Sequence, residues 1–182
     1  FEIRLPRHNL YEPVLRMAAE EVALAKLNRP FINVAGIVGP TEQAVKEARL
    51  ARTLNYDLGL LSNGGLGNLS ENELIERAQQ VADIIPVFGF YLQPAVGGRI
   101  LSFDFWKRFA AIKNVHAIKV AAFNRYQTLD VVRAVCQSDR LNEIALYTCN
   151  DDSNVGDLLT PYGFQKKRKI VEKRFVGGLL GH

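Results

Sequence analysis

One lysine stands where a buried strand should carry no charge. Residues 115–122 read VHAIKVAA, an apolar run of strand length, and Lys119 lies within it. Burying an ammonium group costs several kcal/mol unless the group is paired or gives up its proton. An uncharged lysine amine is a nucleophile that forms Schiff bases with carbonyl substrates. Lys119 therefore predicts imine chemistry, and the alternative is a lysine that reaches solvent from the end of its strand.

Two further residues could serve the same reaction. Tyr91 ends the preceding apolar run, and Arg99 follows in the loop after Gly97 and Gly98. Neighbouring strands lie about 4.8 Å apart, so a tyrosine and a lysine at adjacent strand ends can address one small molecule. The phenol would move protons to and from the carbinolamine. The guanidinium would hold a carboxylate or order the loop.

The elements that position these residues alternate between strand and helix. Strand-like runs begin near residues 31, 57, 86, 115, 143 and 174, about 26 to 31 residues apart, and amphipathic segments lie between them. The strands are apolar on both faces, as parallel strands covered by helices are. With no dinucleotide fingerprint, this period favours a (β/α)₈ TIM barrel. About six of eight units are present, so we expect an incomplete barrel that lacks N-terminal strands and C-terminal helices.

Composition and capping residues agree with an ordinary globular domain. The 182 residues are 48% apolar and 23% charged, and we treat 1–182 as a single partial-barrel domain. A helix is predicted for residues 11–26. Ser70 with Glu73 forms a capping box for a later helix, and Ser102 caps the one that carries Phe105 and Trp106.

At these positions the sequence resembles a known family. Residues 91–94 (YLQP) with Arg99, followed by residues 117–119 (AIK) with Lys119 placed 28 residues after Tyr91, are similar to the dihydrodipicolinate synthase / N-acetylneuraminate lyase family. Residues 31–36, 148–152 and 174–179 fit its third strand, its Gly-Asp-Asp-like turn and its eighth strand.

The resemblance implies a TIM barrel that condenses or cleaves 2-oxo acids, usually pyruvate. Lys119 would form the imine, Tyr91 would transfer protons, and Arg99 would bind substrate. The resemblance also implies a homo-oligomer, commonly a tetramer, and no metal or organic cofactor, since the imine itself activates the substrate.

Two departures from the family pattern bear on the substrate. The family's Gly-Thr-Thr-Gly-Glu motif, which binds the pyruvate carboxylate, is absent, with Glu2 as its one conceivable trace. Residues 62–67 (SNGGLG) stand where the synthases carry Pro-Tyr-Tyr. The glycines would widen the pocket mouth and suit a bulkier substrate such as a sugar acid.

We therefore expect a Schiff-base lyase or aldolase of 2-oxo acids. A sugar-acid dehydratase would use the same imine. The alternatives from other classes are a barrel that binds a phosphate ligand through Gly177, Gly178 and Gly181, and a non-catalytic barrel homologue. Glycines in a strand more often allow close packing.

Other polar residues have simpler interpretations. We expect the His116 ring to face the surrounding helices, and Asp151 with Asp152 to cap the next helix rather than bind a metal. The basic run at residues 165–169 reads as a solvated loop, because no nucleic-acid motif accompanies a net charge of +4. Cys136 and Cys149 lack metal-ligand spacing and indicate free thiols in a cytoplasmic protein. No apolar run approaches the length of a membrane span, so a membrane is not an expected partner. Nucleic acid is not an expected partner either, since no binding motif accompanies the basic run.

Overall fold

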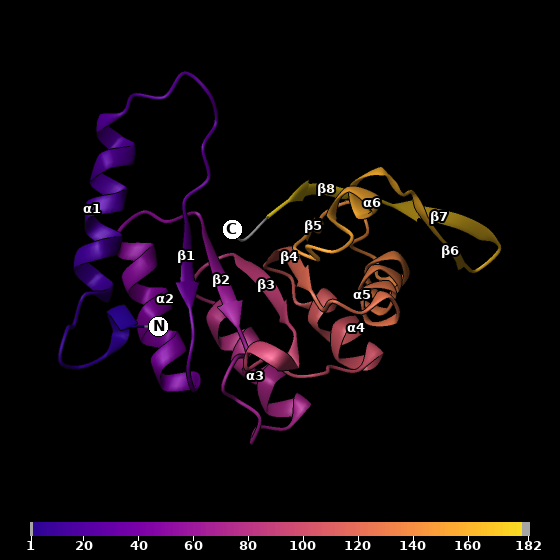
Figure 1. Ribbon diagram of the computed structural model, residues 1–182, viewed down its shortest axis with the longest axis horizontal. Helices are drawn as coiled ribbons and strands as arrows, with labels where there is room; N and C mark the ends of the chain where they lie inside the picture. Colours follow the sequence, from indigo (N-terminus) through magenta and orange to yellow (C-terminus); the bar gives the residue numbers. More distant parts are fainter. Residues whose placement is uncertain (1, 180–182) are drawn as a thin grey trace.

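A computed structural model describes residues 2–179, and its centre is one parallel sheet (Figure 1). Six strands stand in the order β1-β2-β3-β4-β5-β8. Their bounds are β1 Val34–Ile37, β2 Leu58–Ser62, β3 Val87–Leu92, β4 Val115–Ala121, β5 Ala145–Thr148 and β8 Phe175–Gly178. All six lie where the sequence pattern predicts a strand, and every adjacent pair is parallel.

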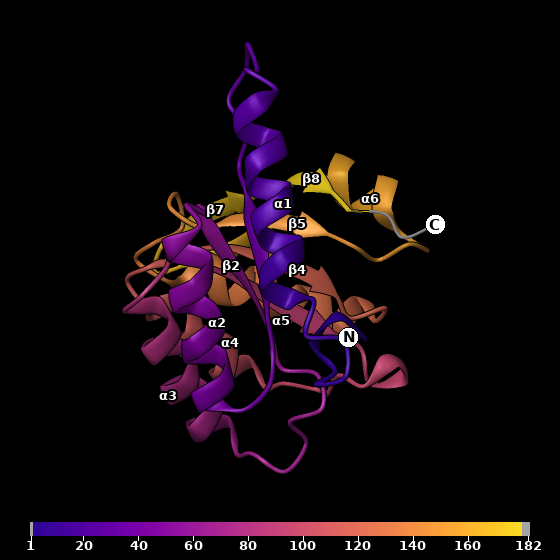
Figure 2. The ribbon, with the colours of Figure 1, turned by 90° about the vertical axis from the view of Figure 1, so that its left-hand side faces the viewer.

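Helices connect the strands and cover one face of the sheet. The chain opens with η1 Glu2–Arg4 and α1 Tyr11–Leu24; the helices that follow are α2 Thr41–Thr53, α3 Glu71–Ala82, η2 Pro94–Val96, α4 Phe103–Ala111, α5 Arg125–Gln137 and α6 Asn154–Leu159. Figure 2 shows α2, α3 and α4 together on one side of the strands. The predicted capping box of Ser70 with Glu73 is present, and Ser102 caps α4. We call the sheet face toward α2–α5 the outer face and the opposite one the inner face.

The outer face carries the main aromatic packing. Phe105, Trp106 and Phe109 of α4 are buried, and Tyr91 of β3 packs against Trp106 with ring centroids 5.0 Å apart. Gly89 makes room for this layer, because a Cβ there would lie 2.5 Å from the Phe109 ring. The close approach of α4 to β3 therefore depends on that glycine.

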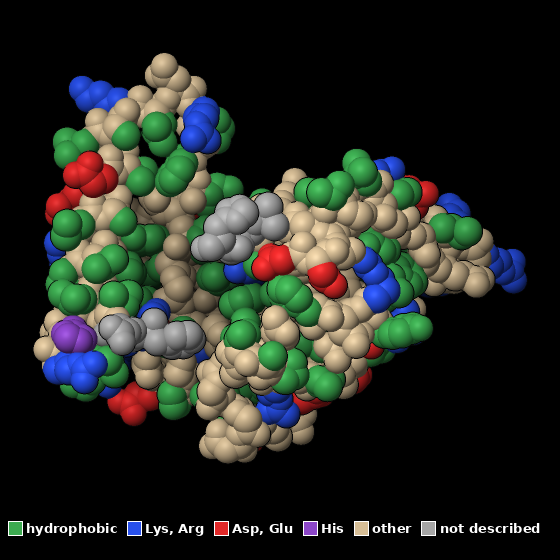
Figure 3. All heavy atoms as spheres, in the orientation of Figure 1, with side chains coloured by type: hydrophobic (Ala, Val, Ile, Leu, Met, Phe, Trp, Pro, Cys, Tyr) green, Lys and Arg blue, Asp and Glu red, His purple; other side chains and the backbone are tan. Residues whose placement is uncertain are grey.

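The inner face carries the alternate residues of the same strands. In the β3–β4 register Phe88 pairs with Ala117 and Phe90 with Lys119, and Lys119 pairs in turn with Tyr147 of β5. The register shifts between Val87 and Phe88. Figure 3 looks onto this side of the sheet, which is hollowed between α1 and the strands β5 and β8.

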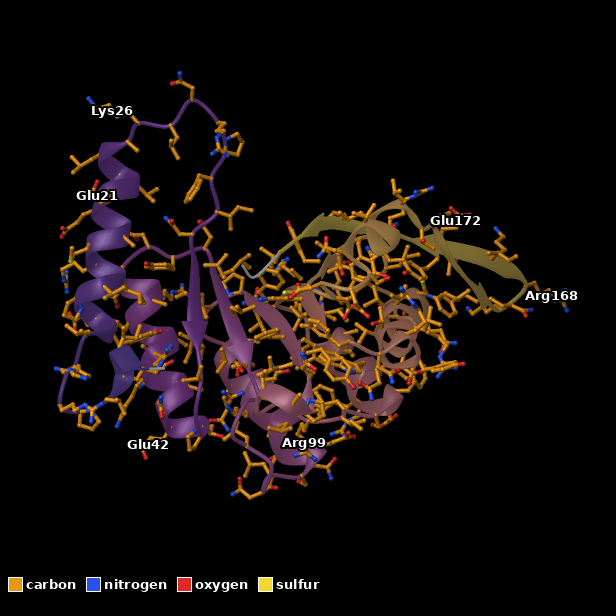
Figure 4. The ribbon with its side chains drawn as sticks, viewed as in Figure 1. Glu21, Lys26, Glu42, Arg99, Arg168 and Glu172 are labelled. Carbon is orange, nitrogen blue, oxygen red and sulfur yellow. The ribbon has the colours of Figure 1, made fainter. Side chains whose placement is uncertain are left out.

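A two-stranded hairpin was missed from the sequence. Strands β6 Tyr162–Lys166 and β7 Lys169–Lys173 pair antiparallel and project from the body (Figure 1). The basic run read as a solvated loop is the tip of this hairpin, with Arg168 at its end (Figure 4). The less exposed side chains of the hairpin are partly apolar. Lys166 Nζ donates to Ser138 O at 2.6 Å, which ties the hairpin to the end of α5. The alternation of apolar and polar residues in β6 and β7 is hard to recognise in the sequence, because the same two strands carry the basic run.

Two smaller expectations were wrong. The His116 ring is exposed and lies 3.2 Å from Asn114 Oδ1, so it does not face the helices. A register shift in that part of β3–β4 interrupts the alternation on which the expectation depended. Asp151 and Asp152 do not cap α6, because its N-cap residue is Ser153. They stand in the turn before that position and are exposed.

The Gly89–Phe109 contact gives a test of this packing. We expect Gly89→Ala to lower the free energy of unfolding by about 1–3 kcal/mol, because the added methyl group overpacks the α4 interface. Gly67→Ala is the control: nothing lies within 4 Å of its Cβ, so its change should stay within about 0.5 kcal/mol. Urea unfolding measures both, and equal values for the two variants would contradict the packing.

Candidate active site

Lys119 lies on the inner face of the sheet, between β3 and β5. Its side chain is half-buried, and Nζ stands 4.4 Å from the centroid of the Phe90 ring on the neighbouring strand. Within residues 2–179 no carboxylate forms an ion pair with it. An aromatic ring face attracts positive charge, whether an ammonium or a protonated imine carries it. The amine is therefore placed toward the interior of the partial barrel and against an aromatic wall.

Phe90 is also a wall of a cavity, which we call the inner cavity. It has a volume of about 320 Å³ and lies over the carboxyl-terminal halves of β1, β2 and β3. Its lining residues are Arg4, Gly36, Val38, Leu60, Ser62, Phe90, Leu92 and Val96. Ligands of parallel α/β folds bind at this end of the strands. Lys119 and the inner cavity thus share one aromatic side chain at the expected end of the sheet.

A second and larger cavity, the mouth cavity, opens beside the inner cavity. It measures about 680 Å³ and is formed by the loops that follow β1, β2 and β3. Its walls include Gly39, Gly64, Gly65 and Gly97, and it shares Arg4, Val38 and Val96 with the inner cavity. The glycines at residues 64 and 65 do line an open mouth, as expected from their small size.

The loops of the mouth cavity are held by a buried arginine. Arg77 of α3 is fully buried and donates to Gly39 O at 2.8 Å, Asn63 Oδ1 at 3.1 Å and Ser62 O at 3.1 Å. Burial lowers the pKa of Arg77 to about 10, and the nearby Glu47 carboxylate opposes this shift. Arg77 still carries its charge at neutral pH, so it clamps the ends of β1 and β2 together.

Arg4 enters the site from the N-terminal segment. Its Nε donates to Glu47 Oε1 at 2.8 Å, its Nη2 donates to Gly36 O at 2.7 Å, and its guanidinium stacks on the Tyr11 ring at 4.3 Å. Glu47 is buried and also accepts from Val38 N at 2.9 Å. No sequence motif points to Arg4, whose contacts with residues more than thirty positions away are tertiary.

Tyr91 does not lie beside Lys119. Its side chain is fully buried on the outer face against Trp106, and its hydroxyl accepts from Leu101 N at 3.3 Å. Burial raises the pKa of the Tyr91 phenol. Successive residues of a strand point to opposite faces, so Phe90 occupies the place beside Lys119 and Tyr91 cannot. The expected Tyr91–Lys119 pair is therefore not formed.

Arg99 orders a loop and lines neither cavity. Its guanidinium donates to Leu66 O and Leu69 O in the loop after β2. Figure 4 shows Arg99 at the end of the molecule where β1 and β2 terminate. The position of Arg99 in the sequence suggested two roles, holding a carboxylate or ordering the loop. In the structure its guanidinium orders the loop and does not lie beside Lys119.

A second polar cluster, centred on Asp157, fixes the loops that follow β4 and β5. The fully buried carboxylate accepts from Arg125 Nη1 at 2.6 Å, Thr148 Oγ1 at 2.7 Å, Tyr162 OH at 2.7 Å and Asn150 Nδ2 at 2.9 Å. Burial alone would raise the pKa of Asp157, but these hydrogen bonds outweigh it and hold the pKa below its usual value. Asn150 Oδ1 also accepts from Phe123 N at 2.9 Å, which ties the cluster to the turn after the Lys119 strand.

The remaining sequence candidates include two glycines of β8 and the two cysteines. A Cβ at Gly177 would lie 2.8 Å from the Tyr147 ring, and one at Gly178 would lie 2.4 Å from Asn154 Oδ1, so both glycines allow close packing. Gly181 and the segment expected before Phe1 lie outside the described residues. Cys136 and Cys149 are free thiols.

Within residues 2–179, no group of three or more His, Cys, Asp or Glu side chains is arranged to hold a metal ion. No helix in this part of the chain is long and apolar enough to cross a membrane.

The fold and this site define a partial (β/α)₈ barrel with a lysine facing its interior. Solved structures with the same fold are members of the family that the sequence resembles. An N-acetylneuraminate lyase from Mycoplasma synoviae matches with a TM-score of 0.60 and 22% identity, over 80% of this chain and 46% of that one. A dihydrodipicolinate synthase from Bacillus anthracis gives a TM-score of 0.68 and 17% identity, over 81% and 48%.

A third match is a prophage protein of the dihydrodipicolinic acid synthase family from E. coli K12, solved in complex with pyruvate. It has a TM-score of 0.63 and 19% identity, over 80% of this chain and 47% of that one. The chain therefore spans about half the length of the structures it matches, and the incomplete barrel is confirmed. No family model and no curated protein matches the sequence.

The Asp157 cluster makes a prediction with a definite pH dependence. Asp157→Asn should lower the free energy of unfolding at pH 7 by about 1–3 kcal/mol, because it removes the charge of a buried carboxylate that is paired with the half-exposed Arg125 and accepts several hydrogen bonds. The unfolded aspartate titrates near pH 3.9 and the native one lower, so this contribution is complete above about pH 4 and is lost as the pH falls through the native pKa.

Urea unfolding of both proteins between pH 7 and pH 2 measures the difference. The exposed Asp152→Asn is the control and should leave stability within about 0.5 kcal/mol of the starting protein. A difference between the Asp157→Asn variant and the starting protein that stays constant below pH 4 would count against an ionised Asp157.

Proposed function

We propose that this protein is a lyase or aldolase that binds 2-oxo acids, pyruvate among them, as a Schiff base on Lys119. The observation that carries the proposal is the position of the Lys119 amine, on the inner face of a barrel of this family's fold and in contact with the Phe90 ring at 4.4 Å. The inner cavity beside it can hold a small acid.

The chemistry follows from the amine and its aromatic wall. The Lys119 amine attacks the keto carbon and forms a carbinolamine, which takes up one proton from solvent, loses the former keto oxygen as water and leaves a protonated imine. The imine accepts the electron pair of the carbon–carbon bond that breaks, and the reverse sequence forms that bond. Phe90 lies where the imine charge develops, and a ring face stabilises such a charge by about 0.5–2 kcal/mol. Elimination of water from a sugar acid would proceed through the same imine.

Borohydride trapping tests the proposal. With pyruvate present, hydride adds to the imine carbon and leaves a stable secondary amine, which peptide mass spectrometry should locate on Lys119. Lys119→Met should abolish the adduct, whereas Lys113→Met, in the loop before the same strand, should retain it. Absence of an adduct with pyruvate and with other 2-oxo acids would refute Schiff-base chemistry.

Tyr91 gives a separate prediction, because its hydroxyl lies on the outer face. Tyr91→Phe should lower the free energy of unfolding by about 1 kcal/mol, through the lost acceptor for Leu101 N. The rate of adduct formation on Lys119 should change by less than about twofold, since the phenol does not reach the amine. A tenfold or greater fall in that rate would instead restore Tyr91 as the proton-transferring group. Time-resolved trapping with pyruvate distinguishes the two results.

A further inference from the structure

The walls of the mouth cavity bear on the rest of the substrate. The imine would form beside Phe90, and the inner cavity that Phe90 lines shares the side chains of Arg4, Val38 and Val96 with the mouth cavity. A 2-oxo acid bound through Lys119 would therefore direct the group beyond its keto carbon toward the mouth cavity. At about 680 Å³ this space is large enough for a ring or a branched chain.

The side chains that line the mouth cavity are mostly apolar: Leu5, Val38, Pro40, Leu66, Leu69 and Val96. It has three polar side chains, of which two are bound to Glu47 and the third, Asn68, is exposed. Arg4 is paired with Glu47, and Gln43 Nε2 donates to Glu47 Oε1 at 2.9 Å. No acidic side chain lines the cavity among residues 2–179.

Several backbone polar groups of these walls are also paired within the protein. Gly65 N donates to Gly97 O at 3.0 Å, and Leu66 N to Asn63 O at 3.3 Å. Gly39 O accepts from Arg77 Nε. The carbonyls of Leu66 and Leu69 accept from Arg99. A chain of hydroxyl groups would find few free partners here, and each buried hydroxyl left unpaired weakens binding by roughly tenfold.

From this pairing we infer that the mouth cavity selects an apolar substituent, an aryl or branched alkyl group, on the carbonyl substrate. The sugar-acid substrate expected from glycine size alone fits these walls less well. The inference rests on the proposed imine at Lys119 and specifies its substrate class. Val96 determines the preference, because it lies on η2 and borders both cavities.

Competitive trapping provides the first test. The protein is incubated with equal concentrations of phenylpyruvate and a six-carbon polyhydroxylated 2-oxo acid, reduced with borohydride, and the Lys119 adducts are quantified by mass spectrometry. We expect the phenyl adduct to exceed the polyhydroxylated one by tenfold or more. Equal amounts, or an excess of the polyhydroxylated adduct, would overturn the inference.

Val96→Asp is the matched variant, because Val96 is 59% exposed and its replacement should not disturb folding. It places a charge in the apolar wall and should reduce the phenyl preference, measured as the ratio of the two adducts, at least fivefold. Ile100→Asp is the control: Ile100 is 62% exposed, lies four residues along the same loop and lines neither cavity, so the preference should persist. An unchanged preference in Val96→Asp would overturn the role of this wall.

A second measurement separates this inference from the imine itself. 3-Phenylpropanoate lacks the ketone, so its binding, measured by calorimetry, needs no reaction at Lys119. Binding that weakens at least fivefold in Val96→Asp and not in Ile100→Asp supports the apolar cavity even where pyruvate leaves no adduct, a result that would defeat only the Schiff-base proposal. No binding of 3-phenylpropanoate, together with no phenyl preference in trapping, overturns the inference.

Discussion

Because successive side chains of a strand point to opposite faces, the register between β3 and β4 decides which groups can act with Lys119. Phe90 pairs with Lys119, so the aromatic ring and the amine share the inner face. Tyr91 then points outward and packs on Trp106. A shift by one residue would exchange Phe90 and Tyr91 and bury an aromatic ring in the wrong layer. The chemistry of the inner face and the packing of α4 are therefore fixed by the same register.

Two buried charges hold the loops around that face. Arg77 binds the ends of β1 and β2, and Asp157 binds the turns after β4 and β5. Burying each of these charges costs desolvation free energy, which is offset only because nearly all of its hydrogen bonds are made. Loops with many glycines would otherwise sample many conformations. The two clusters therefore hold the loops after β1 and β2 and those after β4 and β5 in fixed conformations.

The sequence predicted the six parallel strands and most of the helices, because their apolar periods are strong and their caps are local. It also singled out Lys119, since a charge in an apolar strand is visible without a structure; the role of Lys119 in forming an imine stays a prediction. It assigned Tyr91 to the wrong face, because the irregular register at Val87 and Phe88 depends on packing between two strands. Arg4 and Asp157 were not predicted from the sequence for a similar reason. Their partners are distant in the sequence or lie in the β6–β7 hairpin, whose charged residues obscure its apolar alternation.

The mouth cavity shows why residue size alone is a weak guide to the substrate. Gly64 and Gly65 make space, but the class of ligand depends on which polar groups in that space remain free. Arg99 and Arg77 donate hydrogen bonds to carbonyl groups of the surrounding loops, and Gly65 N donates to Gly97 O. The guanidinium groups of both arginines donate to backbone carbonyl groups. The surface that they leave is mostly apolar, and an apolar surface favours carbon over hydroxyl groups in the proposed substrate.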